Sequence, residues 1–257
     1  MFIENKTETN CLACENLIDQ LEIGRGYSLD LSLTQSELNN IRSLLNLHWL
    51  KNIKKYSPEN LERFSENGIE RYHELSHLID HHEAWPKSNR IFPQSSVDYI
   101  RSTSLIKDLE KIYGDFSISD EENIGREEMY WRLVRPAQSS DMGALHADAW
   151  FWELGHGITP PNTKRVKVWI ALFCEPGLSG LRVVPESHKK MWPYHGEYRD
   201  GFMKPQIDIK EEDVSAQTVY TKPGDAIVFH DRLLHGGAPN TSKKTRVSME
   251  FTMLIRQ

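Results

Sequence analysis

Cysteine is scarce in this sequence, since its 257 residues include only Cys11, Cys14 and Cys174. Three cysteines cannot form the framework of pairs that staples small secreted domains, and so low and odd a count is typical of a reducing cytoplasm. Cys11 and Cys14 have the CxxC spacing of half a zinc site or of a redox pair. No second Cys or His pair stands nearby, so this motif alone assigns no function.

An excess of positive charge and a long apolar run are also missing. Lys and Arg number 31 against 37 Asp and Glu, a net charge of −6, which does not favour nucleic acid or an acidic membrane as a partner. The longest apolar run, 168–174, is too short to cross a bilayer and is expected to be a buried strand. The first ten residues lack a basic stretch followed by an apolar one, so we expect no secretory signal and a cytoplasmic location. With nucleic acid and membrane disfavoured, we expect the partner to be a small molecule. The sequence leaves the oligomeric state open.

The chain is long enough, with 39% hydrophobic residues, to bury a sizeable core in one domain. We expect a mostly helical support region over 1–126. Thr34-Gln35-Ser36-Glu37 is a capping box, and the apolar residues after it share one helical face: Leu38, Ile41, Leu45 and Trp49. The pattern predicts further helices from Pro58, over 69–82 and over 95–113. A lid, a dimer surface and plain core support are all open as roles for this half.

The pattern changes near residue 127 to short strands without helices between them. Strand-like segments cover 129–134, 166–174, 181–185, 218–221, 225–230 and 245–254, and Gly, Pro and Asn turns separate them. This order favours an antiparallel sandwich or jelly roll over 127–257 rather than βαβ units. The fold class is therefore mainly β with a helical N-terminal half.

The first candidate site matches the HExxH pattern of zinc hydrolases, with His73, Glu74 and His77. Two His residues four apart on a helix can bind zinc beside a glutamate base. His81 and His82 follow, but the Gly-containing spacing of the longer metalloprotease motif is absent. The polar face of a surface helix explains this short pattern at least as well.

The second candidate combines His146, Asp148 and His235. Residues i and i+2 of a strand point to the same face, so His146 and Asp148 can reach one ion, and a jelly roll can bring His235 from another strand. Two His and one carboxylate fill one face of an octahedron and leave three positions open, which is the ligand set of non-haem Fe(II) oxygenases. Other histidines of the β half compete for the distal position: His156, His188, His195 and, above all, His230.

The third candidate is Arg246 with Ser248, eleven and thirteen residues after His235. Both would lie on one face of a late strand. A guanidinium forks onto a carboxylate, and a hydroxyl adds a donor, so an incoming dicarboxylate is one partner. An internal acid such as Glu250 is the alternative partner, since a buried unpaired Arg is costly.

In the β half, the motifs together resemble the phytanoyl-CoA dioxygenase-like branch of the Fe(II)/2-oxoglutarate-dependent oxygenases. The matching segments are LHADAWFW, VKVWIALFCEP, GLRVVPESHKK, KPGDAIVFHDRLLHGGAPNTS and TRVSMEFTM, within about 128–254. The resemblance implies a double-stranded β-helix, with Fe(II) held by His146, Asp148 and His235. It implies that 2-oxoglutarate binds this iron, with its far carboxylate on Arg246 and Ser248, and that O2 is consumed. Hydroxylation of a C–H bond would accompany release of succinate and CO2.

Asp148 also bears on the reaction outcome, because related halogenases carry a small residue in place of this carboxylate. Its presence favours hydroxylation. The segment AWFWELGHG after it is bulky and aromatic, which does not favour phytanoyl-CoA itself as the substrate. Candidate substrate contacts are Trp150, Trp152, His156 and Arg132. Tyr130 and Lys167 are further candidates for contacts to the co-substrate.

Overall fold

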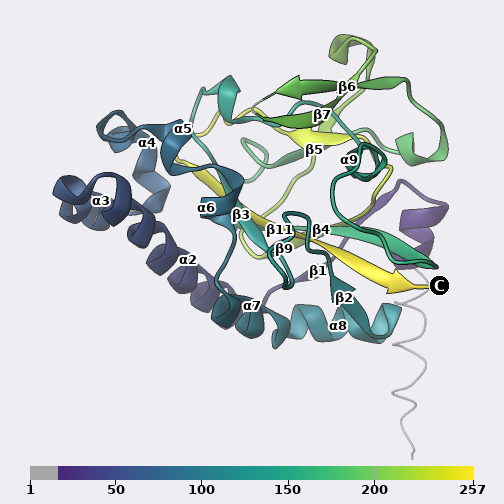
Figure 1. The fold of residues 1–257 in the computed structure, drawn as a ribbon, viewed down its shortest axis with the longest axis horizontal. Helices are drawn as coiled ribbons and strands as arrows, with labels where there is room; N and C mark the ends of the chain where they lie inside the picture. The colour runs from purple at the N-terminus through teal and green to yellow at the C-terminus, as the bar shows by residue number, and fades with distance from the viewer. Residues whose placement is uncertain (1–16, 200) are drawn as a thin grey trace, which may run out of the picture.

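The structure is a computed structural model that describes residues 17–199 and 201–257. Strands from the second half of the chain form its centre, and helices from the first half lie along one side of them (Figure 1). None of the helices in these two ranges has the length and apolarity needed to cross a membrane.

The main sheet has six strands, all paired antiparallel. Its order runs β1 (Tyr27–Ser32), β9 (Asp225–His230), β4 (Thr163–Phe173), β11 (Arg246–Arg256) and β2 (Phe116–Ile118), and β3 (Tyr130–Val134) also pairs with β11. β2 and β3 share one edge of β11, where β3 pairs with its first half and β2 with its last residues. Because β11 lies between β4 and β3, residues from these three strands share the inner face of the sheet.

A second, smaller sheet faces the main one. It consists of β10 (His235–Gly237), β5 (Leu181–Val183) and β8 (Gln217–Thr218). Trp169 and Phe229 from the main sheet pack in one cluster with Leu181, Val183 and Leu233. The two-stranded hairpin of β6 (Tyr194–Arg199) and β7 (Phe202–Ile207) adds to this side. Two antiparallel sheets around a common core confirm the expected jelly roll.

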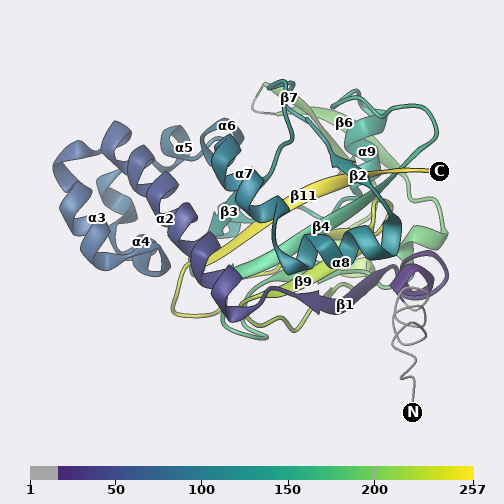
Figure 2. The same cartoon turned by 90° about the horizontal axis from the view of Figure 1, so that it is seen from below.

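Helices cover the outer face of the main sheet (Figure 2). The capping box at Thr34 is present and starts α2 (Gln35–Tyr56), whose buried residues include all four of the predicted stripe. The stripe packs with the outward residues of β11, such as Met249 and Phe251, in the largest apolar cluster of the described residues. Alternation along β11 therefore divides its side chains, with apolar groups toward the helices and polar groups toward the interior.

Parts of the helical half differ from the sequence prediction. The helix expected over 95–113 is two helices, α7 (Gln94–Arg101) and α8 (Ser104–Tyr113), because Thr103 is extended and starts a new helix. The stretch 69–82 breaks into short turns instead of one helix: η2 (Ile69–Arg71), α4 (Tyr72–Leu75), η3 (Ser76–Leu78) and α5 (His81–Ala84). The remaining helical segments here are η1 (Pro58–Asn60), α3 (Leu61–Asn67) and α6 (Lys87–Arg90). The first half also supplies β1 and β2 to the sheet, so it is not only helical.

Candidate active site

The side chains of His146, Asp148 and His235 converge on one point. One ligand atom from each lies within 4.8 Å of the others, and the residues the structure describes contain no other such group of three His, Cys, Asp or Glu. Asp148 Oδ1 is 3.6 Å from His146 Nε2 and 3.7 Å from His235 Nε2. The predicted triad is therefore assembled by the fold.

Backbone pairing brings together two histidines that are 89 positions apart in the chain. His146 and His235 form an isolated antiparallel bridge, in which each N–H donates to the other's carbonyl at 2.9 and 2.8 Å. The backbone of residues 143–144 passes close to Gly236, which follows His235. A Cβ at position 236 would lie 3.0 Å from Ala144 O. The HGG sequence thus has a steric reason at its first glycine.

The prediction that His146 and Asp148 lie on one strand is wrong. Asp148 starts the short helix α9 (Asp148–Glu153), and Ala149 N donates to Asp231 O at 2.9 Å as the chain turns. Ala147 keeps an extended backbone, with φ −109° and ψ 137°. This one extended residue suffices to place the side chains on either side of it toward the same point.

Hydrogen bonds to carbonyl groups fix the orientation of both imidazoles. His146 Nδ1 is 2.7 Å from Ala144 O, and His235 Nδ1 is 2.9 Å from Leu233 O. A carbonyl only accepts, so each Nδ1 carries the proton and each Nε2 presents a lone pair to the centre. Burial lowers the pKa of His235 to about 4, although Asp148 opposes this shift, so His235 is neutral near pH 7.

Asp148 is charged in spite of its burial. Burial alone would raise its pKa, but the positive charge of Lys167 outweighs this effect and, with smaller contributions from His235 and His146, holds the pKa far below its usual range. Its second oxygen, Oδ2, is buried without a hydrogen-bond partner. Two imidazole nitrogens and one carboxylate oxygen fit a divalent metal ion, and they are the donor set of non-haem iron centres.

Arg246 is buried in the same barrel interior, with 2% of its surface exposed. Its Nη1 donates to Ser248 Oγ at 2.8 Å, and its Nε has no hydrogen-bond partner. Burial lowers the pKa of Arg246 to about 10, and the nearby positive charge of Arg132 adds to this.

Glu250, the alternative partner for Arg246, forms its ion pairs with two other residues. Its carboxylate lies 3.8 Å from Arg132 Nε and 3.7 Å from Lys167 Nζ. Within the described ranges Arg246 has no ion pair with an acid. A buried guanidinium without a counter-ion is a ready site for an anionic group.

One aromatic residue beside the metal ligands, Phe151, was not predicted from the sequence. Its ring meets His146 edge-on at 5.2 Å and His156 at 5.4 Å. Asp148 and Phe151 are three residues apart in α9, so they share one face of the helix. This spacing in the HADAWF segment could have identified Phe151.

The predicted substrate residues lie in different surroundings. Trp150 is buried and stacks on Tyr194 at 4.5 Å, while Trp152 lies against Gly157 and the guanidinium of Arg165. His156 faces Phe151 and hydrogen-bonds Met203 O. Arg132 lies near the ligands, because a Cβ at Gly143 would be 3.0 Å from its Nη1 and 4.0 Å from His146 Cε1. Substrate contact by these four residues stays a prediction.

Tyr130 and Lys167, the further candidates, lie deeper in the barrel. Lys167 Nζ is 3.9 Å from Asp148 Oδ2. Tyr130 is buried, with Lys87 and Lys167 over its ring at 4.5 and 5.4 Å. Burial raises the pKa of Tyr130 above its ordinary value.

The HExxH match does not form a metal site. His73 Nδ1 bonds Thr245 Oγ1 at 3.1 Å, and Glu74 pairs with Arg71. The helical turn needed to align His73 with His77 ends at Leu75, where a 3-10 turn begins. Cys11 and Cys14 lie outside the described residues.

The competing histidines also have other partners. His230 Nδ1 lies 3.3 Å from Asp231 and its ring 5.2 Å from that of His188, and His195 pairs with Asp208 at the surface. His235 is therefore the distal histidine of the site.

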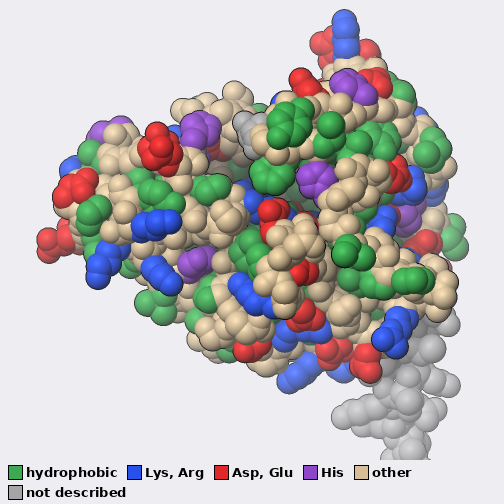
Figure 3. Space-filling model, in the orientation of Figure 1, with side chains coloured by type: hydrophobic (Ala, Val, Ile, Leu, Met, Phe, Trp, Pro, Cys, Tyr) green, Lys and Arg blue, Asp and Glu red, His purple; other side chains and the backbone are tan. Residues whose placement is uncertain are grey.

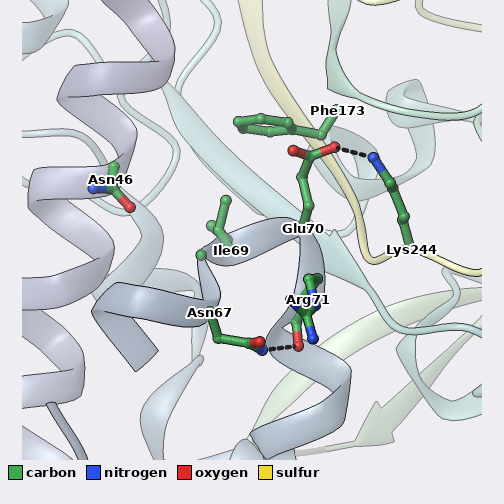
Figure 4. Close-up of a pocket in the computed structure, with 8 residues that line it drawn as sticks. Asn46, Asn67, Ile69, Glu70, Arg71, Phe173 and Lys244 are labelled. Atoms are coloured by element: carbon green, nitrogen blue, oxygen red, sulfur yellow. Dashed lines mark hydrogen bonds and ion pairs between the residues drawn. The ribbon is translucent and has the colours of Figure 1, made fainter. Parts of the chain in front are cut away.

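A separate pocket of about 240 Å³ lies between α2, η2 and the end of β4 (Figure 4). It is lined by Asn46, Asn67, Gly68, Ile69, Glu70, Arg71, Phe173 and Lys244. Glu70 and Lys244 pair across it at 3.2 Å. None of the metal-ligand candidates lines this pocket, so it is distinct from the candidate active site.

Comparison with known proteins extends these observations. The family model for phytanoyl-CoA dioxygenase (PhyH) matches residues 100–248, more than half of the chain. No functionally curated protein matches significantly.

Solved structures share the fold. The epimerase SnoN, in complex with Fe3+, alpha ketoglutarate and nogalamycin RO, is 15% identical with a TM-score of 0.56, covering 96% of this chain and 84% of that chain. The alpha ketoglutarate-dependent carbocyclase SnoK is 15% identical with a TM-score of 0.56, covering 94% and 83%. The non-heme monooxygenase ThoJ is 20% identical with a TM-score of 0.52, covering 90% and 74%.

Proposed function

Because the chain belongs to the phytanoyl-CoA dioxygenase family, we propose that it is an Fe(II)- and 2-oxoglutarate-dependent oxygenase that hydroxylates a C–H bond of a small metabolite. The observation that carries the proposal is the combination of two features in one barrel. Two lone-pair nitrogens and one charged carboxylate oxygen converge on a point, and a buried guanidinium without a counter-ion lies on the same inner sheet face.

Each residue has a defined task in this proposal. His146, Asp148 and His235 would hold Fe(II), and Arg246 with Ser248 would bind the far carboxylate of 2-oxoglutarate. Bound iron, 2-oxoglutarate and O2 supply the oxidising chemistry, with succinate and CO2 as co-products. Trp169 and Phe229 close the interior between the two sheets, which keeps bulk water away from the reacting groups.

A row of rings leads from the metal ligands to the surface and supports a substrate path on that side. His146, Phe151, His156 and Phe202 follow one another with centroid separations of 5.2, 5.4 and 6.5 Å. Hydrophobic side chains gather beside a histidine on the face that carries β6 and β7 (Figure 3). The exposed apolar residues of this hairpin are Tyr198, Phe202 and Met203. An aromatic, partly apolar approach suits a compact metabolite with a flat or apolar portion.

The relatives with this fold include an epimerase and a carbocyclase by name. The presence of Asp148 as a carboxylate ligand favours hydroxylation over halogenation, and we propose hydroxylation rather than epimerisation or ring closure as the outcome. The expected product of the productive reaction is therefore the substrate plus one oxygen atom. A halogenated product, or an epimer without added oxygen, would contradict this part of the proposal.

The test is conversion of 2-oxoglutarate to succinate, with dependence on added Fe(II). We expect His146→Ala and His235→Ala to abolish both iron binding and succinate formation. His73→Ala and His230→Ala are matched controls, which should retain both. Loss of metal in His73→Ala with retention in His235→Ala would instead favour a zinc hydrolase. Binding of iron and 2-oxoglutarate without any substrate-stimulated turnover would favour a non-catalytic binding protein.

A further inference from the structure

Lys167 is a buried lysine directly behind the metal-ligand candidates. It projects from β4 into the barrel with 3% of its side chain exposed. Its Nζ lies 3.7 Å from Glu250 Oε2, 3.8 Å from Glu121 Oε1 and 3.9 Å from Asp148 Oδ2. A buried ammonium among three carboxylates is stabilised by them and in turn fixes their positions.

The two oxygens of Asp148 face different partners. Oδ1 points to both imidazole Nε2 atoms, at 3.6 and 3.7 Å. Oδ2 faces the ammonium of Lys167 at 3.9 Å, and it has no hydrogen-bond partner. The carboxylate is thus oriented with one oxygen toward the metal position and the other toward the ammonium.

The helical half of the chain holds Lys167 in place. Glu121, which follows β2, accepts from Lys87 of α6 at 2.8 Å and from Thr252 Oγ1 at 2.9 Å. Lys87 also pairs with Glu128 at 2.8 Å. Burial opposes ionisation of Glu121, but Lys167 and Lys87 outweigh it and hold its pKa at about 2. Alternating charges therefore connect α6 to the metal ligand in the order Lys87, Glu121, Lys167 and Asp148.

From this geometry we infer that Lys167 is a positioning residue that keeps Asp148 a one-oxygen metal ligand, and that Glu121 anchors Lys167 for this task. The inference rests on the proposed function. An octahedral metal with two imidazoles and one carboxylate oxygen has three open positions, as 2-oxoglutarate and O2 together require. If Oδ2 also bound the metal, only two positions would remain open.

The first measurement uses Mn(II) alone, without 2-oxoglutarate. Water-proton relaxation reports how many waters the bound metal carries. The wild-type protein should carry three, and Lys167→Met should carry two, so its relaxation enhancement should fall by about one third. Glu121→Gln keeps Lys167 but loosens it, and should give a value between the two. The matched control is Lys164→Met on the same strand, whose ion pair is with Glu22; it should behave as the wild type.

The second measurement is anaerobic binding of 2-oxoglutarate to the Fe(II) protein. We expect the dissociation constant to rise at least tenfold in Lys167→Met and a few-fold in Glu121→Gln, because 2-oxoglutarate must displace the second carboxylate oxygen. An unchanged number of metal-bound waters in Lys167→Met overturns the inference. If 2-oxoglutarate binding weakens while the water number stays the same, Lys167 is a direct contact of the co-substrate and not a positioning residue. A lowered unfolding midpoint with no change in either readout marks a purely structural role and also overturns it.

Two further outcomes are distinct. If Lys167→Met does not fold, the water number of Glu121→Gln decides, and a wild-type value there contradicts the inference. If the wild-type protein binds neither metal nor 2-oxoglutarate, the proposed function fails, whatever the variants do.

Discussion

Replacement of Arg246 by methionine should weaken co-substrate binding without lowering the stability of the apo protein. Arg246 is buried, one of its nitrogens bonds Ser248, and its Nε has no partner. Methionine has a similar length and no charge, so it can occupy the same space without desolvating an ion.

For binding, loss of the charged fork should cost about 3 kcal/mol, near the middle of the range for truncating one member of a buried charged pair. This corresponds to a roughly hundredfold rise in the dissociation constant of 2-oxoglutarate. Arg246→Lys keeps the charge but not the planar fork, so its dissociation constant for 2-oxoglutarate should lie between those of the wild type and Arg246→Met. Anaerobic calorimetric titration of the Fe(II) protein with 2-oxoglutarate measures all three affinities.

For stability, the free energy of unfolding of metal-free Arg246→Met should stay the same or rise by about 1 kcal/mol, because an uncompensated buried charge is removed. Arg90→Met is the matched control. Arg90 donates to Trp85 O at 2.9 Å and to Trp131 O at 2.8 Å, so its loss leaves carbonyls without a donor and should lower stability. Urea unfolding compares the two. If Arg246→Met destabilises the apo protein as Arg90→Met does and leaves 2-oxoglutarate binding intact, Arg246 is structural and the reasoning is wrong.

Three further predictions concern the ring row, the pH response and the metal. Phe151→Ala removes the ring against His146 and should leave 2-oxoglutarate affinity within about threefold of wild type, while substrate turnover measured in a product assay drops at least tenfold. The control is Tyr220→Ala, which removes an exposed ring and should leave turnover unchanged. Burial lowers the pKa of His48 and of His81 from 6.5 to about 4. As pH falls below 6.5, these histidines therefore take up protons in the unfolded chain before they do so in the folded protein. The free energy of unfolding should decrease between pH 6.5 and pH 4, by at most about 1.4 kcal/mol per pH unit for each histidine. His48→Gln should flatten that slope in urea unfolding series, and an unchanged slope would refute the assignment. Mn(II) at one hundred times its dissociation constant should stabilise the wild type by about 2.7 kcal/mol, with no such gain in His235→Ala.

Local signals account for the parts of the fold that sequence predicted well. The capping box and its apolar stripe define α2, and the apolar runs of β4, β9 and β11 carry their own strand periodicity. The β6–β7 hairpin was missed because its residues are largely polar or exposed and include Pro205. The Asp200-Gly201 dipeptide between these strands is a recognised hairpin signal and could have revealed it.

The candidate site was predictable only where its residues are marked by spacing. The HxD motif, the distal His235 and the later Arg246 stand in an order that the sequence displays, although the strand assigned to Asp148 was wrong. The cluster around Lys167 could not be predicted in this way. Its members depend on the register of β4 against β11 and on the loop after β2, which places Glu121 of the first half beside a strand of the second.

The central claim is that one iron and one 2-oxoglutarate bind together at His146, Asp148 and His235. The most direct test is an anaerobic titration of the Fe(II) protein with 2-oxoglutarate, followed through the visible charge-transfer absorption of iron chelated by a 2-oxo acid. We predict a band that saturates at one 2-oxoglutarate per chain, is absent in His235→Ala and needs far more 2-oxoglutarate in Arg246→Met. No band in the wild type, or a full band in His235→Ala, would contradict the account.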